Sequence, residues 1–215
     1  MKFEGAIFDL DGVIVDTVPL HFKAWKKMFA EYGKNFDFDA YKAKVDGIPR
    51  IDGARAVLAN LSQNELEKAA SKKQDYFLEL LDKEKIKVYH STVEFIEKLR
   101  IAGIKRAVIS SSKNCRHILE RVVLVDYFDV IITGSDVKKG KPEPDIFLLA
   151  SRKLRTAPDK CVVFEDAVLG VEAAKRADMK CVGVDRYQSP QRLYKADLII
   201  SDLSEVDIEK IHTLF

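Results

Sequence analysis

Two acidic side chains stand close together near the start of the 215-residue chain, in the segment Asp9-Leu10-Asp11-Gly12. Neighbouring carboxylates repel each other unless a cation lies between them or one is protonated. Gly12 allows the chain to curl tightly just after the two acids. We therefore expect a cation site here. The alternative is that either acid only caps the next helix, but Asp16 and Thr17, just ahead of a proline, are better placed for that role.

Three later segments carry further polar groups. Ser110-Ser111-Ser112 precedes a helix that is expected to begin near Asn114. Hydroxyl and backbone N–H groups at such a position typically bind an anion. The alternative is that the serines only cap the helix. Lys141 lies between Gly140 and Pro142, and we expect it to be held as a point charge that binds a phosphate. The alternative is an ordinary solvated lysine. Glu165-Asp166 offers the oxygen ligands that Mg²⁺ prefers, or else a helix cap.

Short apolar runs precede most of these segments and predict the strands of a parallel sheet. They are β-branched and end in small or polar residues, which is typical of strands buried on both faces. Helical periodicity separates the later runs, so we expect a doubly wound α/β fold. In such a sheet, ligands bind beyond the carboxyl ends of the strands, where the four polar segments meet. The predicted strands are Ala6–Phe8, Ala107–Ile109, Val130–Ile132, Val162–Phe164, Val182–Val184 and Leu198–Ile200.

Residues 17–85 have a different pattern, with apolar side chains at helical spacing and no convincing strand. Phe22, Trp25 and Phe29 form one such stripe, and Val57, Leu58 and Leu61 another. An insertion this long exceeds an ordinary crossover, so we expect a separate helical cap domain over 17–85 and a core of 1–16 with 86–215. The expected hinges are 15–18 and 83–88.

Composition excludes several classes of protein. Thirty-six basic against 34 acidic residues leave a charge of +2, without the basic excess typical of duplex DNA binding. The start of the chain lacks the apolar run of a secretory signal or a membrane span. Three widely spaced cysteines indicate buried thiols, not disulfides or a zinc site. We expect a cytoplasmic monomer that binds no nucleic acid and no membrane.

The motifs together resemble those of the haloacid dehalogenase superfamily of phosphoryl-transfer enzymes. DLDGVIVDT at 9–17 resembles its signature, and Ser110, Lys141 and Glu165-Asp166 match its other motifs in order. The chain is most similar to the β-phosphoglucomutase-like branch, which implies a doubly wound parallel-sheet (Rossmann-like) core with an inserted all-helical cap. One departure is Tyr89-His90-Ser91-Thr92, where that branch usually has Tyr-Pro-Gly. Here we expect a polar turn, with Ser91 or Thr92 free to cap the helix.

The resemblance also implies roles for individual residues. Asp9 is expected to be the nucleophile that forms an aspartyl-phosphate, and Asp11 the general acid and base. Ser110 and Lys141 are expected to neutralise the transferring oxygens. Mg²⁺ is the implied cofactor, held by Asp9, the backbone carbonyl of Asp11 and Asp166, with Glu165 orienting its water shell. The implied substrate-binding residues are Thr17, His21, Trp25, Gly47, Arg50, Lys73, Ser111, Ser112, Lys113 and Asn114.

Some of these residues have simpler interpretations. His21 could be a packed surface histidine, Trp25 a core residue and Arg50 an ordinary surface charge. The leading functional hypothesis is a Mg²⁺-dependent phosphatase of a small phosphomonoester such as a sugar phosphate. The alternatives are a β-phosphoglucomutase, which converts β-glucose 1-phosphate to glucose 6-phosphate, and more remotely a non-catalytic binding protein on the same fold. The presence of Asp9 argues against the last.

Overall fold

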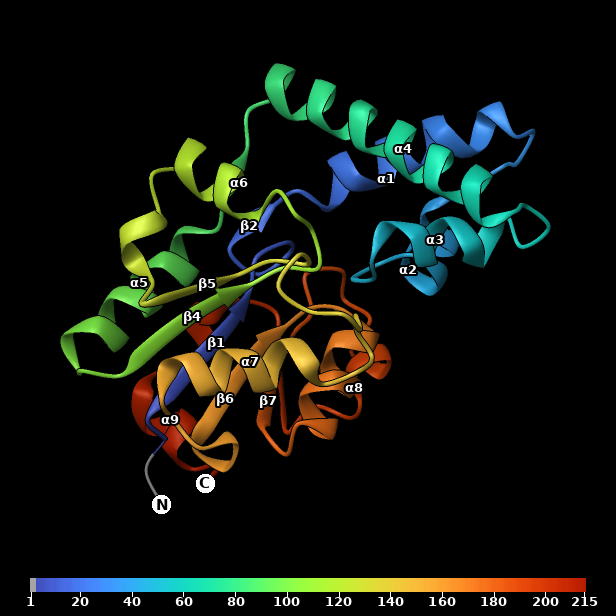
Figure 1. The fold of residues 1–215 in the computed structure, drawn as a ribbon. Coiled ribbons are helices and arrows are strands. Elements are labelled where there is room, and N and C mark those ends of the chain that lie inside the picture. Colours follow the sequence, from blue (N-terminus) through green and yellow to red (C-terminus); the bar gives the residue numbers. More distant parts are fainter. Residues whose placement is uncertain (1–2) are drawn as a thin grey trace.

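A six-stranded parallel sheet forms the centre of the molecule in the computed structural model, which describes residues 3–215 (Figure 1). The strands run in the order β5-β4-β1-β6-β7-β8, and all five pairings are parallel. Their bounds are β1 Gly5–Asp9, β4 Lys105–Ile109, β5 Val130–Ile132, β6 Cys161–Glu165, β7 Lys180–Val184 and β8 Leu198–Ile200. Each strand contains one of the predicted apolar runs, so the doubly wound α/β class is confirmed.

Helices cover both faces of the sheet, which explains why the central residues of its strands are apolar. On β1, Ala6 and Phe8 pack into one apolar cluster, while Ile7 points to the opposite face and packs into another. The ring of Phe8 stacks on that of Phe164 at a centroid distance of 4.6 Å. The first cluster includes helices α5 His90–Ile101, α6 Cys115–Arg121 and α9 Ile208–His212, and the second α7 Asp145–Leu154 and α8 Val168–Arg176.

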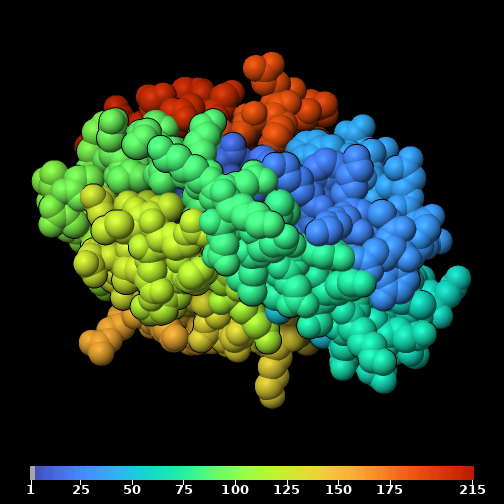
Figure 2. All heavy atoms as spheres, turned by 90° about the horizontal axis from the view of Figure 1, so that it is seen from above, coloured from blue at the N-terminus to red at the C-terminus, as the bar shows by residue number. Residues whose placement is uncertain are grey.

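A helical cap follows β1, as predicted. Its helices are α1 Val18–Glu31, α2 Phe38–Lys44, α3 Arg50–Val57 and α4 Gln63–Lys83. They lie above the carboxyl edge of the sheet, and the view from above shows their blue-to-teal atoms against the green and yellow atoms of later core segments (Figures 1 and 2). The cap has its own apolar core, in which Trp25 stacks on Phe29. The stripe through Leu58 and Leu61 is not one helix, because α3 ends at Val57.

Two short strands join the cap to the core. β2 Val15–Asp16 pairs antiparallel with β3 Lys87–Val88, so the two segments expected to be hinges form one small ribbon. Periodicity cannot reveal strands of two residues. The division into a core of 1–16 and 86–215 and a cap of 17–85 remains our proposal.

The expected caps of α5 were wrong. The helix already begins at His90, so Ser91 and Thr92 lie inside its first turn and not before it. Ser91 Oγ donates to Asp202 Oδ2 at 2.8 Å, and Thr92 Oγ1 donates to the carbonyl oxygen of Val13 at 2.8 Å. The two hydroxyls therefore tie the start of this helix to neighbouring loops of the core.

Two further expectations concern the cysteines and the membrane. All three cysteines are buried, unpaired thiols, as predicted. Across residues 3–215, no helix combines the length and the apolar character needed to cross a membrane.

Candidate active site

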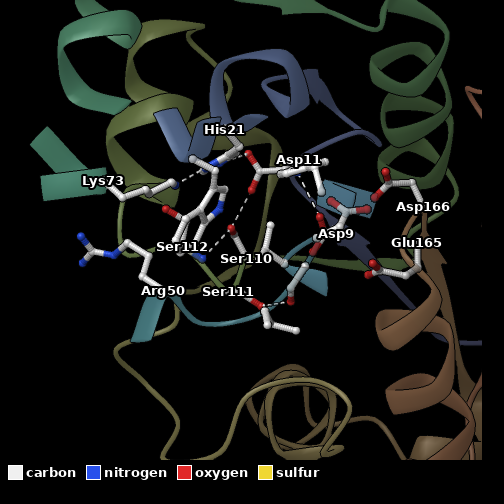
Figure 3. Close-up of a pocket in the computed structure, with 16 residues that line it drawn as sticks. Asp9, Asp11, His21, Arg50, Lys73, Ser110, Ser111, Ser112, Glu165 and Asp166 are labelled. Carbon is white, nitrogen blue, oxygen red and sulfur yellow. Dashed lines mark hydrogen bonds and ion pairs between the residues drawn. The ribbon is translucent and has the colours of Figure 1, made fainter. Parts of the chain in front are cut away.

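Three adjacent strands bring the predicted catalytic groups to one edge of the sheet. Asp9 ends β1, Glu165 ends the neighbouring strand β6, and Ser110 follows β4 on the other side. Asp166 comes directly after β6. Asp9, Glu165 and Asp166 each offer one carboxylate oxygen, and these three oxygens lie within 4.8 Å of one another. Figure 3 shows Glu165 and Asp166 beside Asp9.

A cavity between this edge and the cap gathers most of the predicted site residues. Core residues line one side and cap residues the other, so the two parts of the chain face each other across it (Figure 3). The predicted residues that line it are Asp9, Asp11, His21, Trp25, Gly47, Arg50, Lys73, Ser110, Ser111, Ser112, Glu165 and Asp166.

Lys141 forms ion pairs with two of the carboxylates, those of Asp9 and Glu165. Its Nζ lies 2.6 Å from Asp9 Oδ1 and 2.8 Å from Glu165 Oε2, and the residue is only 4% exposed. Burial disfavours a charged lysine, but the two carboxylates outweigh this effect and raise the pKa of Lys141. The ammonium therefore stays protonated beside the predicted nucleophile, where a phosphate would also need positive charge. The interpretation of Lys141 as a solvated lysine is excluded.

The nearby positive charge does not fully compensate the carboxylates of Asp9, Glu165 and Asp166. Burial, followed by the charge of Glu165, raises the pKa of Asp9 well above its usual range. Burial raises the pKa of Glu165 as well, and that of Asp166 to about 7. Ionised carboxylates crowded in this way are stabilised by a cation placed between them. A set of ligands consisting only of oxygens suits a hard divalent ion, so the residues present fit a metal such as Mg²⁺.

Asp11 has a different environment, in which hydrogen-bond donors surround its carboxylate. Ser110 Oγ donates to Asp11 Oδ2 at 2.8 Å, the Thr17 hydroxyl donates to Oδ1, and His21 Nε2 lies 3.3 Å from Oδ1. Burial alone would raise the pKa of Asp11, but these groups hold it well below its usual range. Asp11 is therefore ionised here and is able to accept a proton.

The cap contributes a buried pair of nitrogen bases. Lys73 Nζ lies 2.8 Å from His21 Nδ1, and His21 stacks on Phe77 at a centroid distance of 4.0 Å. Burial, aided by the charge of Arg50, lowers the pKa of Lys73 to about 7. His21 is thus not a surface histidine. Trp25 combines two of the expected roles, because it packs in the cap core and also lines the cavity.

Two glycines allow close approaches at the site. Gly12 has φ +85°, and a Cβ there would lie 2.4 Å from Asp166 Oδ2. Gly47 has φ +74°, and a Cβ there would lie 3.1 Å from the Cβ of Ala167. The carbonyl oxygen of Gly47 also accepts a hydrogen bond from Ser111 Oγ at 2.7 Å, which joins the cap to the core. The positive φ favours glycine at both positions, and at Gly12 the close approach of Asp166 leaves no room for a Cβ.

Four predicted residues do not line this cavity. Lys113 and Lys141 line a neighbouring cavity of about 410 Å³ that shares Arg50 and Ser111 with it. The Asn114 amide exchanges hydrogen bonds with Gln74 of α4. Thr17 is fully buried. The polar groups of Thr17 and Asn114 are hydrogen-bonded to Asp11 and Gln74, and a substrate contact for these two residues stays a prediction.

Sequence inspection missed one basic residue and one acidic residue at the site. Lys42 and Asp46 form a buried ion pair, and Lys42 Nζ lies 3.3 Å from Asp166 Oδ2. A lysine and an aspartate four residues apart usually form a solvated pair on a helix surface. Nothing in the spacing distinguishes the buried case, so no sequence signal marks these two residues.

Comparisons with known proteins agree with this geometry. The haloacid dehalogenase-like hydrolase family profile matches residues 6–184. A phosphorylated carbohydrates phosphatase from Thermotoga maritima is 37% identical over 185 residues, which cover 82% of each chain. A β-phosphoglucomutase from Bacillus subtilis is 33% identical over 218 residues, which cover 97% of this chain and 94% of the relative.

A solved structure shows the same arrangement of cap and core. The β-phosphoglucomutase of Clostridium difficile superposes with a TM-score of 0.90 at 30% identity, covering 99% of this chain and 96% of that one. The sequence motifs, the sheet with its helical cap and the acidic edge therefore all indicate the same family. The chain belongs to the haloacid dehalogenase-like hydrolases, as a member of their β-phosphoglucomutase-like branch.

Proposed function

We propose that this enzyme is a Mg²⁺-dependent phosphatase of a small phosphomonoester such as a sugar phosphate, acting through an aspartyl-phosphate on Asp9. The observation that carries the proposal is the cluster of Asp9, Glu165 and Asp166, with oxygens within 4.8 Å of one another and Lys141 bound to Asp9. The Thermotoga maritima relative, which is named a phosphorylated carbohydrates phosphatase, supports the substrate class.

The carboxylates would hold the metal at the edge of the sheet. Mg²⁺ would be bound by Asp9, Asp166 and the backbone carbonyl of Asp11, with Glu165 orienting its water shell. When bound, the ion supplies the positive charge that screens the repulsion between the Asp9 carboxylate and an anionic phosphate. Side chains of the protein carry out the first nucleophilic attack and the proton transfers.

In the first step, an oxygen of Asp9 attacks phosphorus, and the bond from phosphorus to the substrate's leaving oxygen breaks. Lys141 and Ser110 neutralise the transferring oxygens, and the 2.6 Å distance between Lys141 Nζ and Asp9 Oδ1 supports this role for the lysine. Asp11 protonates the leaving oxygen. Its pKa is low in the free enzyme, but the negative charge of a bound phosphate opposes ionisation and raises it.

In the second step, Asp11 removes a proton from water, which attacks the phosphorus of the aspartyl-phosphate. The bond between phosphorus and Asp9 breaks, phosphate leaves and Asp9 is restored. The ionised state of Asp11, held by Ser110, Thr17 and His21, is the state that this base requires.

A β-phosphoglucomutase is the second candidate. Arg50, His21 and Lys73 of the cap line the same cavity as Asp9, where they could bind the hydroxyls or a second phosphate of a sugar. The B. subtilis relative carries this name. In that reaction a sugar hydroxyl, and not water, attacks the aspartyl-phosphate, so the two activities share the first step and differ in the acceptor.

One pair of assays tests both candidates. Phosphate release is measured across p-nitrophenyl phosphate and a panel of sugar phosphates, with Mg²⁺ and with EDTA. A coupled assay follows glucose 6-phosphate formed from β-glucose 1-phosphate with a bisphosphate primer. Mg²⁺-dependent release supports the phosphatase, and primer-dependent glucose 6-phosphate the mutase. Absence of both activities would contradict the proposal and favour a binding protein.

A further inference from the structure

A lysine of the cap reaches the carboxylate that is proposed to bind the metal. Lys42 lies on α2, and its Nζ lies 3.3 Å from Oδ2 of Asp166, at the end of β6 in the core. The same ammonium is paired with Asp46. The side chains of Lys42, Asp46 and Asp166 are 5%, 7% and 4% exposed. This contact is therefore a buried connection between cap and core and not a solvated surface pair.

A core loop after β7 fixes the position of α2. Arg192 donates to the carbonyl oxygen of Lys42 at 3.0 Å. The ring of Tyr187 lies 5.0 Å from Lys42 Nζ and 5.3 Å from the ring of Phe38, which begins α2. Both ends of the helix therefore contact the same loop, and the lysine is held above Asp166.

We infer that Lys42 competes with the divalent ion for Asp166 and thereby couples metal binding to the docking of α2. The inference rests on the proposed function, since it needs a metal at Asp9 and Asp166. An ammonium and a divalent ion repel each other strongly when both lie within a few ångströms of one carboxylate in a buried site. The carboxylate of Asp166 can fully compensate the charge of only one of these two cations, so metal binding must weaken the Lys42–Asp166 pair.

Asp46 makes the exchange feasible without leaving a buried lysine unpaired. It lies one turn beyond Lys42, moves with the cap and is already paired with the ammonium. When Lys42 leaves Asp166, its charge remains compensated by Asp46, which avoids the cost of an isolated buried charge. The same event removes the ion pair that joins α2 to the sheet edge, because Lys42 belongs to α2 and Asp166 to the core. It leaves α2 docked by its contacts with Tyr187 and Arg192.

The first test measures Mg²⁺ binding by titration calorimetry in the wild type, in Lys42→Met and in Lys44→Met, whose lysine is exposed on the same helix. Coupling free energies between linked sites typically correspond to 5–150-fold. We expect Lys42→Met to bind Mg²⁺ at least about fivefold more tightly and Lys44→Met to match the wild type. Unchanged or weaker binding by Lys42→Met would overturn the inference. If that variant fails to fold, Lys42→Gln replaces it with the same expectation.

The second test follows hydrogen exchange of the amides of α2 without substrate. Mg²⁺ should increase exchange in α2 of the wild type, whereas in Lys42→Met exchange should already be high and should not respond. If the exchange rate of the α2 amides in the wild type is the same with and without bound Mg²⁺, the coupling is contradicted. Absence of any Mg²⁺ binding by the wild type would instead contradict the proposed function, so the two failures are distinguishable.

Discussion

Lys141 Nζ lies 2.6 Å from Asp9 Oδ1, although the two residues are 132 positions apart in the chain. Asp9 ends the central strand, and Lys141 precedes α7 on one face of the sheet. Both are buried, so neither charge is screened by water. The predicted nucleophile and a fixed positive charge therefore meet before any substrate arrives, which is the preorganisation that stabilises charge in a transition state.

Substitution of the nucleophile should abolish turnover without loss of the fold. Asp9→Asn keeps the size of the side chain but removes the nucleophilic oxygen charge. We expect phosphate release to fall by about 10⁴-fold or more, as is typical when a nucleophile is removed. Steady-state phosphate release, with circular dichroism to verify the fold, measures this. A variant that keeps more than about a tenth of wild-type activity would contradict the role of Asp9.

Loss of Lys141 should affect both catalysis and stability. Lys141→Ala removes a charge used in the transition state, so kcat should fall by about 10²–10³-fold. It also leaves Asp9 and Glu165 buried without their cation, which should lower the free energy of unfolding in EDTA by about 3 kcal/mol. Urea unfolding and steady-state kinetics measure the two effects. The control is Lys139→Ala, an exposed lysine of the same loop. Equal losses in both variants would exclude a specific role.

Arg50 should distinguish between the two candidate reactions. It lies in the wall shared by the two cavities, where it could bind a second phosphate. We expect Arg50→Ala to reduce isomerisation of β-glucose 1-phosphate at least about 30-fold more than hydrolysis of p-nitrophenyl phosphate. If the wild type does not isomerise, hydrolysis of a sugar bisphosphate replaces that assay. Arg55→Ala, an exposed position of α3, is the control. An equal loss in both reactions argues against a distal phosphate contact.

Lys73 should make stability depend on pH. Its pKa falls from 10.5 in the unfolded chain to about 7 in the folded protein. Between these values the unfolded chain binds the extra proton, so stability increases with pH across this window, and below it the charged lysine is destabilising. Lys73→Met should therefore be more stable than the wild type at pH 6 by an amount on the order of 3 kcal/mol.

The advantage of Lys73→Met should shrink as the pH rises from 7 towards 10, because the lysine of the unfolded chain then also loses its proton and folding no longer has to remove it. Urea unfolding at several pH values, in EDTA and without substrate, measures the difference. Lys68→Met, on an exposed face of α4, should show no such trend. A difference between Lys73→Met and the wild type that is constant with pH would contradict the low pKa.

Much of the fold could be predicted from the chain because its strands are buried on both faces. Runs such as Val162–Phe164 must be apolar throughout, and this is visible without any partner strand. The two strands of the hinge ribbon are too short to show a period. α2 was not predicted because it has only seven residues, and its buried positions include a lysine. Ser91 and Thr92 were misjudged because their partners, Val13 and Asp202, are distant in sequence.

The candidate site was predictable where a residue type at a strand end already implies its chemistry. Asp9, Ser110 and Glu165 end or follow neighbouring strands, so topology alone brings them together. Lys42 and Asp46 could not be recognised, because their burial arises from the packing of the cap on the core and not from local spacing. Residues that depend on the relative position of two domains remain invisible until the fold is known.

The central claim is that Asp9 accepts a phosphoryl group when a divalent ion is bound beside it. The most direct measurement is mass spectrometry of peptides after acid quench of the enzyme during turnover of a sugar phosphate. We expect the peptide that contains Asp9 to gain the mass of one phosphoryl group with Mg²⁺, and not with EDTA or in Asp9→Asn. Modification of a different residue, or continued turnover of Asp9→Asn, would contradict the account.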